Sequence, residues 1–132
     1  MANNSKKIVK KIKALGAKSI VSNHNFTLTP RLSEITKIYK RMLSVKGDVC
    51  KIITTAKKID DNLTCLRFVV EASKSNNVVC FCMGELGVIS RVLSPIFGGY
   101  FTYASVGKGK ESAVGQLTVA ETKKIYELIN KN

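Results

Sequence analysis

The stretch VCKIITT, which spans Val49–Thr55, decides the fold that we predict for this chain. Branched and thiol side chains surround Lys51 in it, a composition typical of a strand buried on both faces of a parallel sheet. Burial of an ammonium group is costly, and buried lysines usually respond with a depressed pKa. Such an amine is a nucleophile that can form a Schiff base with a carbonyl substrate. Alternatively, Lys51 lies at a strand end and extends its ammonium group into solvent.

Strands and helices alternate on both sides of this stretch. Periodic apolar residues predict a leading helix over residues 1–16 and later helices that start near Thr29-Pro30, Asp60, Val88 and Val119. Strands are predicted over residues 18–23, 49–53, 78–83 and 100–104. This alternation implies a parallel sheet with right-handed crossovers, either a (β/α) barrel wall or an open doubly wound sheet. We therefore predict one α/β domain over residues 1–132, with four strand–helix units in residues 17–132.

The net charge of +13 over 132 residues is large. It is compatible with a nucleic acid, an acidic membrane surface or an anionic substrate as the partner. Most lysines, however, fall on the solvent-facing sides of predicted helices, so a solvated surface is the simplest interpretation. No run approaches the roughly 18 apolar residues of a membrane span, and no apolar signal-peptide core follows the first residues. We expect a cytoplasmic protein that does not bind membranes.

The cysteines do not form a metal-binding pattern. Cys50, Cys65, Cys80 and Cys82 lack the spacing of a zinc site, and His24 is the only histidine. Cys80 and Cys82 would share one face of a strand. We expect reduced thiols that fill the core as small apolar side chains.

The residues that could take part in binding or catalysis fall at similar places in the predicted sheet. His24, Lys51, Met83 and the glycine-rich loop Ser105–Gln116 all lie at or near the carboxyl ends of strands. In parallel α/β folds this end of the sheet carries the active site. We therefore expect these residues to lie together.

Four short motifs follow one another along the chain: SNHNF at residues 22–26, CKI at 50–52, GVISR at 87–91 and SAVGQ at 112–116. Together they resemble the motifs of type I 3-dehydroquinate dehydratase, and the resemblance covers nearly the whole chain. It implies the C-terminal half, with four strands, of a TIM-type (β/α)8 barrel. It also implies dehydration of 3-dehydroquinate to 3-dehydroshikimate in the shikimate pathway, through a lysine Schiff base and without a cofactor.

The resemblance also implies roles for individual residues. Lys51 would form the imine with the substrate ketone, and His24 would act first as general base and then as general acid. Arg91 would bind the substrate carboxylate with a bidentate fork. The remaining implied site residues are Ser112 and Gln116, on a loop that closes over the substrate, and Met83, beside the imine.

The sequence departs from the family pattern in composition and in length. Asn25 stands where aspartate is usual, Val114 where proline is usual, and Thr55-Ala56 where Met-Pro is usual. The family barrel has about 250 residues, so about half of it is missing here, including an acidic group that orients the histidine.

Because the chain is only half as long as the family barrel, three hypotheses about its function remain. In the first, the missing half comes from a second chain, a longer reading frame or self-association. In the second, the chain is an inactive half-barrel or a binding module that needs a separate N-terminal half. In the third, it binds nucleic acid, although no RNA-recognition signature accompanies its charge.

An open row of four parallel strands would also affect association. Both sheet edges would be unpaired. The face that carries Val49, Ile53 and Phe81 would lie uncovered. Because exposed apolar surfaces promote association, we expect either a homo-oligomer or a complex with a complementary N-terminal half-barrel.

Overall fold

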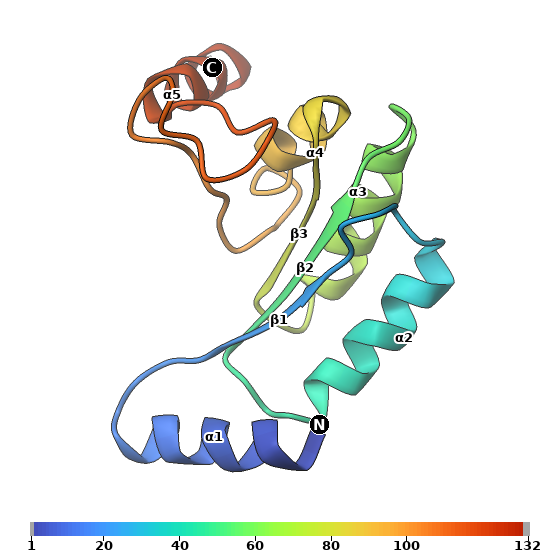
Figure 1. The fold of residues 1–132 in the computed structure, drawn as a ribbon, viewed down its shortest axis with the longest axis vertical. Helices are drawn as coiled ribbons and strands as arrows, with labels where there is room; N and C mark the ends of the chain where they lie inside the picture. The colour runs from blue at the N-terminus through green and yellow to red at the C-terminus, as the bar shows by residue number, and fades with distance from the viewer. Residues whose placement is uncertain (1, 131–132) are drawn as a thin grey trace.

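The computed structural model describes residues 2–130, in which helices pack around one small sheet (Figure 1). The elements are α1 (Ala2–Ala14), β1 (Ile20–His24), α2 (Leu32–Leu43), β2 (Val49–Thr55), α3 (Asp61–Ala72), β3 (Val78–Met83), the 3-10 turn η1 (Glu85–Gly87), α4 (Val88–Leu93) and α5 (Val119–Ile129). Among these described residues, no helix combines the length and the apolar character that a membrane crossing requires.

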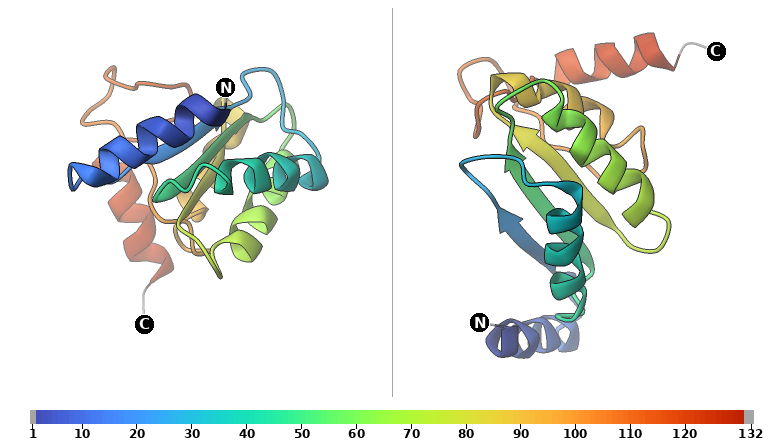
Figure 2. Two further views of the ribbon diagram at one scale, coloured as in Figure 1. Left: turned by 90° about the horizontal axis from the view of Figure 1, so that it is seen from below. Right: turned by 90° about the vertical axis from the view of Figure 1, so that its right-hand side faces the viewer.

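The strands form a parallel sheet in the order β1–β2–β3. Lys51, near the centre of β2, lies opposite Ser22 of β1 and Val79 of β3. Helices α2 and α3 cover one face of the sheet, α1 crosses its amino-terminal end, and α5 lies beyond its carboxyl end (Figure 2). This arrangement confirms the predicted parallel α/β fold.

Side chains of β2 divide between two apolar clusters, because successive strand residues point to opposite faces. Ile52 packs in the larger cluster with buried residues of α2 and α3. Val49 and Ile53 pack on the other face, in a smaller cluster with Phe81. Lys51 has the same parity as Val49 and Ile53, so its side chain belongs to the face opposite the helices.

The predicted fourth strand, over residues 100–104, is wrong. Tyr100 N donates to Val78 O at 2.8 Å, but no ladder continues from there, and the described sheet has three strands. The physical reason lies in the aromatic side chains of this segment. Phe101 packs against the smaller apolar cluster, and Tyr103 meets Phe101 edge-on with 5.4 Å between ring centroids. The segment therefore folds over the sheet instead of extending it.

This segment also overturns the expectation of an uncovered inner face. Val49, Ile53 and Phe81 are 4%, 2% and 2% exposed. Both β1 and β3 are edge strands among residues 2–130, but β3 is buried, whereas most of β1 is exposed and Ile20 on it is 48% exposed. The open part of the sheet is thus the β1 edge.

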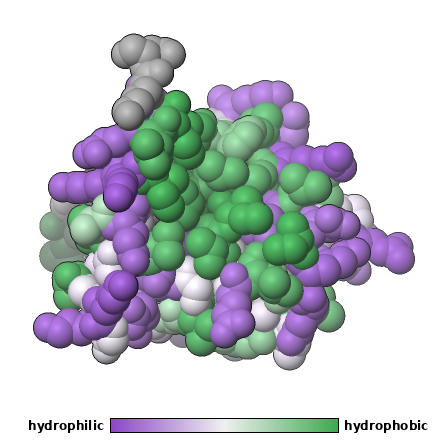
Figure 3. All heavy atoms as spheres, turned by 90° about the horizontal axis from the view of Figure 1, so that it is seen from above, coloured by the Kyte–Doolittle hydropathy of each residue, from purple (hydrophilic) through white to green (hydrophobic). Residues whose placement is uncertain are grey.

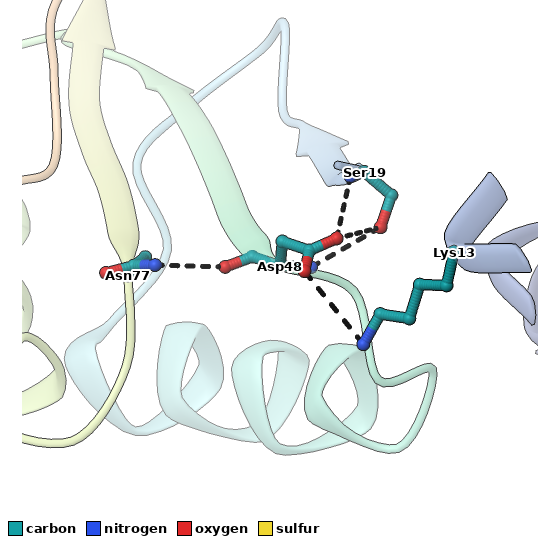
Figure 4. Close-up of polar contacts among 4 residues, drawn as sticks. All are labelled: Lys13, Ser19, Asp48 and Asn77. Carbon is teal, nitrogen blue, oxygen red and sulfur yellow. Dashed lines mark hydrogen bonds and ion pairs between the residues drawn. The ribbon is translucent and has the colours of Figure 1, made fainter. Parts of the chain in front are cut away.

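Polar contacts hold the amino-terminal end of the sheet together (Figure 4). Asp48 Oδ2 accepts hydrogen bonds from Ser19 N at 2.8 Å and Ser19 Oγ at 2.9 Å. Its Oδ1 lies 4.0 Å from Lys13 Nζ, and Asn77 Nδ2 donates to Asp48 O at 3.3 Å. Asp48 therefore connects α1, β1 and the starts of β2 and β3, far from the carboxyl ends of the strands.

Candidate active site

All of the predicted site residues line one hollow of about 240 Å³ at the carboxyl ends of the strands. We call it the active-site hollow. The predicted residues that line it are His24, Lys51, Met83, Arg91, Ser112 and Gln116. They come from all three strands, from α4 and from the loop before α5. The structure therefore brings together residues that are up to 92 positions apart in the sequence, counted from His24 to Gln116.

Lys51 projects from β2 into this hollow. Its Nζ lies 4.5 Å from the centroid of the Tyr103 ring, over the ring face. The ion pairs within residues 2–130 join Lys13 to Asp48 and Lys74 to Glu71, so Lys51 has no carboxylate partner there. The amine is thus held by an aromatic ring and stays accessible to a ligand in the hollow.

His24 ends β1 and lies at the mouth of the hollow. Its ring stacks with that of Phe26 at 5.7 Å between centroids, with 11° between the planes. Partial burial, and to a smaller extent the charge of Lys51, lower the pKa of His24 from its ordinary 6.5. No carboxylate among residues 2–130 contacts the imidazole. The neutral ring is therefore the favoured form at neutral pH, which suits a general base.

The turn after His24 is built by Asn25. Its Oδ1 accepts from Thr27 N at 3.0 Å, Thr27 Oγ1 at 2.9 Å and Leu28 N at 3.0 Å. An aspartate would use the same carboxylate oxygen as acceptor. The Asn25 amide can therefore form the hydrogen bonds of this turn that an aspartate would form, without adding a negative charge beside His24.

Arg91 forms the buried wall of the hollow. It is 4% exposed, and its guanidinium carbon lies 4.5 Å from the Phe81 ring centroid. Nε and Nη2 have no hydrogen-bond partner within residues 2–130. Burial lowers the pKa of Arg91 from its ordinary value, yet an arginine remains charged in proteins. A buried cation with unused N–H groups is a receptor for a planar anion such as a carboxylate.

The loop before α5 closes one side of the hollow. Gln116 Oε1 accepts from Ser112 N at 2.8 Å and from Ser112 Oγ at 3.2 Å. Gly84 N donates to Val114 O at 3.2 Å. Gly115 has φ +80°, and a Cβ there would collide with the Gly84 carbonyl. The loop is therefore fastened at the end of β3 by contacts that need a glycine at position 115.

Sequence reasoning missed several aromatic residues in the hollow. Phe26, Phe81 and Tyr103 line it beside the predicted residues. Phe81 could have been found, because it lies two positions before Met83 on one face of β3. Tyr103 could not, because its position depends on the path of a segment that the pattern predicted to be a strand. Among residues 2–130, no group of three acidic, cysteine or histidine side chains could hold a metal ion.

Comparison with known proteins gives a consistent result. The model of the family described as type I 3-dehydroquinase matches residues 1–132. The 3-dehydroquinate dehydratase of Dehalococcoides mccartyi strain CBDB1 is 43% identical over 114 residues, which are 86% of this chain and 51% of that protein. That of Methanosarcina acetivorans is 36% identical over 124 residues, which are 93% of this chain and 51% of that protein.

Solved structures agree with this result. The type I 3-dehydroquinate dehydratase of Clostridium difficile is 28% identical with a TM-score of 0.88, and the match covers 99% of this chain and 52% of that one. The 3-dehydroquinate dehydratase of Geobacillus kaustophilus, at 22% identity and a TM-score of 0.88, shares the fold over 98% of this chain and 51% of that one. The chain thus spans about half the length of the relatives that it matches. It belongs to the type I 3-dehydroquinase family.

Proposed function

We propose that this chain is the C-terminal, Schiff-base-forming half of a 3-dehydroquinate dehydratase, a hydro-lyase that converts 3-dehydroquinate to 3-dehydroshikimate and water. The observation that carries the proposal is the active-site hollow, in which Lys51, His24 and Arg91 face one another. An amine, a base and an anion receptor in one hollow are the groups that this reaction needs.

The reaction would begin at Lys51. Its amine attacks the substrate ketone, and loss of water leaves an iminium bond that draws electrons from the neighbouring C2 carbon. His24 takes the C2 proton and gives it to the leaving hydroxyl group, which departs as water. Hydrolysis of the remaining imine restores the Lys51 amine and releases the product. The lowered pKa of His24 supports the first proton transfer, because the neutral imidazole is the form that accepts a proton.

Other residues would orient the substrate. Arg91 would bind its carboxylate through the unused N–H groups. Ser112 and Gln116 would hold the loop over the bound substrate, and Met83 would pack beside the imine. The hydrogen bonds between Ser112 and Gln116 support this role, since they give the loop a defined shape next to the hollow.

An N-terminal half-barrel, in the same polypeptide or in a second one, would complete the site. His24 lacks a carboxylate partner among the described residues, and the relatives are about twice as long as this chain. The unpaired edge of β1 and exposed apolar side chains offer a surface for that partner. Apolar side chains gather on the end of the molecule that carries α4 and α5 (Figure 3). The exposed apolar side chains of these two helices include Ile89 in α4 and Leu128 and Ile129 in α5.

We propose a complementary N-terminal half-barrel as this partner, with self-association as the form of the chain alone. We also place the protein in the cytoplasm. The four cysteines are buried and free, a state that suits a reducing compartment.

A binding module without turnover is the second candidate. The observation that favours it is that His24 has no carboxylate partner among residues 2–130, while the anion receptor at Arg91 is in place. Such a half-barrel would bind a carboxylate and form no product.

Reductive trapping tests the proposal. The chain is mixed with 3-dehydroquinate and borohydride, alone and with the separately expressed N-terminal half of the Dehalococcoides mccartyi relative. Sedimentation shows whether the halves associate, and peptide mapping locates the label. We expect labelling of Lys51 when both halves are present and none in Lys51→Arg, whereas Lys57→Arg, which changes a nearby exposed lysine, should label normally. Labelling at another lysine, or none with both halves associated, would overturn the proposal.

A further inference from the structure

The helix that carries Arg91 cannot fix its own position. α4 spans six residues, from Val88 to Leu93, and short helices depend on tertiary contacts because helix nucleation is unfavourable. The Arg91 guanidinium makes no hydrogen bond through Nε or Nη2 within residues 2–130. Contacts made by other residues therefore decide where the Arg91 side chain points.

Asn62, in the first turn of α3, supplies the central contact. Its side chain is 1% exposed. Nδ2 donates to Leu86 O at 2.7 Å and to Ile59 O at 2.9 Å, and Oδ1 accepts from Ser90 N at 2.9 Å. The carboxamide thus uses both of its N–H groups and its oxygen. It joins α3 to the turn before α4 and to the residue directly before Arg91.

Ser90 extends this connection to the sheet. Its hydroxyl accepts from Cys82 N at 2.9 Å and donates to Gly87 O at 3.2 Å. Gly87 lies so close to β3 that a Cβ there would be 2.6 Å from Cys82 O. The start of α4 is therefore held against β3 at the closest distance that the backbone permits, and Asn62 holds it from the α3 side.

We propose that Asn62 is a positioning residue for Arg91. Its carboxamide fixes α4 between α3 and β3, and so holds the guanidinium over Phe81 in the active-site hollow. Without the carboxamide, Leu86 O would lose its partner and Ser90 N would be left unpaired in a buried place, and the turn would move to recover these hydrogen bonds. The identity of the anion that Arg91 binds rests on the proposed function, whereas the placement of Arg91 by Asn62 does not.

The direct test follows the Arg91 side chain by NMR. Its Nε–H signal, identified by its loss in Arg91→Lys, should be shifted by the Phe81 ring, whose centroid lies 4.5 Å from the guanidinium carbon. Asn62→Leu, which keeps the number and branching of the side-chain heavy atoms but makes no hydrogen bonds, should move this signal. Val69→Ala is the matched control, because Val69 is 0% exposed in the same helix and packs in the larger apolar cluster, to which no α4 residue belongs. An unchanged signal in Asn62→Leu, or an equal change in both variants, would overturn the proposal.

Ser90→Ala is a second variant that tests the same proposal if Asn62→Leu does not fold. It removes the hydroxyl between α4 and β3 and leaves Ser90 N available to Asn62, so we expect a smaller shift of the same signal. An unchanged signal in this variant would contradict the connection from Asn62 to the sheet.

A second measurement uses 3-dehydroquinate binding to the complex of the chain with the N-terminal half of the Dehalococcoides mccartyi relative. Asn62→Leu should weaken binding by up to about a hundredfold, the loss that a misplacement of about 1 Å can cause. In an Arg91→Lys background the same change should cost no further affinity, because its effect passes through Arg91. Additive losses would overturn the proposal. If the unmodified complex does not bind 3-dehydroquinate, the proposed function fails, and the NMR result still decides the role of Asn62.

Discussion

Lys51 Nζ lies over the face of the Tyr103 ring, 4.5 Å from its centroid. The ring is itself held edge-on by Phe81, with 6.4 Å between centroids. A cation above an aromatic face is stabilised by about 0.5–1 kcal/mol where the site is exposed. The segment 100–104, which does not form a fourth strand, thus provides an aromatic ring that lies under the Lys51 amine.

This contact predicts a coupling between Lys51 and Tyr103. Tyr103→Phe should leave the free energy of unfolding nearly unchanged, whereas Tyr103→Leu should lower it. Part of that loss, about 0.5–1 kcal/mol, should disappear in a Lys51→Met background. Urea unfolding of the four chains in the cycle measures it. Equal losses in both backgrounds would mean that the ring acts only through Phe81 and Phe101.

His24 should titrate below the ordinary histidine value. Burial and the Lys51 charge lower its pKa from 6.5, so the fold favours the neutral ring. The stability that this provides is complete above pH 6.5 and is lost as the pH falls through the folded-state pKa. Because the chain has one histidine, a single C2–H signal followed by NMR gives the midpoint. Lys51→Met should move it part of the way back, while Lys57→Met should not. A midpoint at or above 6.5 would contradict the prediction.

Arg91→Lys should weaken carboxylate binding by about 1.5–3 kcal/mol, the value of a hydrogen bond to a charged group. An ammonium is a point charge and cannot reproduce the planar fork of a guanidinium. Calorimetric titration of the two-half complex with 3-dehydroquinate measures the loss. Arg67→Lys, on the exposed side of α3, is the control and should bind as the unmodified chain does. Equal affinity of the Arg91 variant would show that the carboxylate binds elsewhere.

Asp48 should make the fold sensitive to acid. Hydrogen bonds from Ser19 N and then Ser19 Oγ lower the pKa of Asp48 from its ordinary 3.8. The stability that it provides is present above that value and is lost as the pH falls through the folded-state pKa. Asp48→Asn should therefore destabilise the chain at pH 7 more than at pH 3. Glu71→Gln, which removes an exposed ion pair with Lys74, should change little at either pH. A loss for Asp48→Asn that does not depend on pH would contradict this account.

The polar residues that line the active-site hollow could be predicted from the sequence, because each lies in or after a strand or in a recognisable motif. Lys51 stands out as a cation within an apolar strand, and Arg91 follows a glycine pair that starts a helix. Thr29 shows the limit of local signals. It looks like a helix cap, yet α2 begins at Leu32, and the Thr29 hydroxyl donates to Thr54 Oγ1 at 2.9 Å and Thr55 O at 3.0 Å. Contacts between distant residues decide such cases.

Asn62 and residues 100–104 illustrate the same limit for the site. An asparagine near a helix start is ordinary in sequence, and only the fold places its carboxamide between α3 and α4. The sequence pattern at 100–104 fits a strand, but a strand also needs a row of hydrogen bonds to the edge of a neighbouring strand. The described fold offers Val78 O for one hydrogen bond and an apolar face for the aromatic rings. Burial of the rings therefore prevails over local strand preference.

Gly115 should be essential for the loop at the active-site hollow. Its φ of +80° costs other residues about 1–2 kcal/mol, and a Cβ would collide with the Gly84 carbonyl. Gly115→Ala should therefore release the loop from β3, weaken 3-dehydroquinate binding and speed tryptic cleavage at Lys108 and Lys110. Gly107→Ala is the control in the same loop, because a Cβ there meets nothing within 4 Å. Cleavage rates and affinities that match between the two variants would show that the contact at Gly84 does not hold the loop.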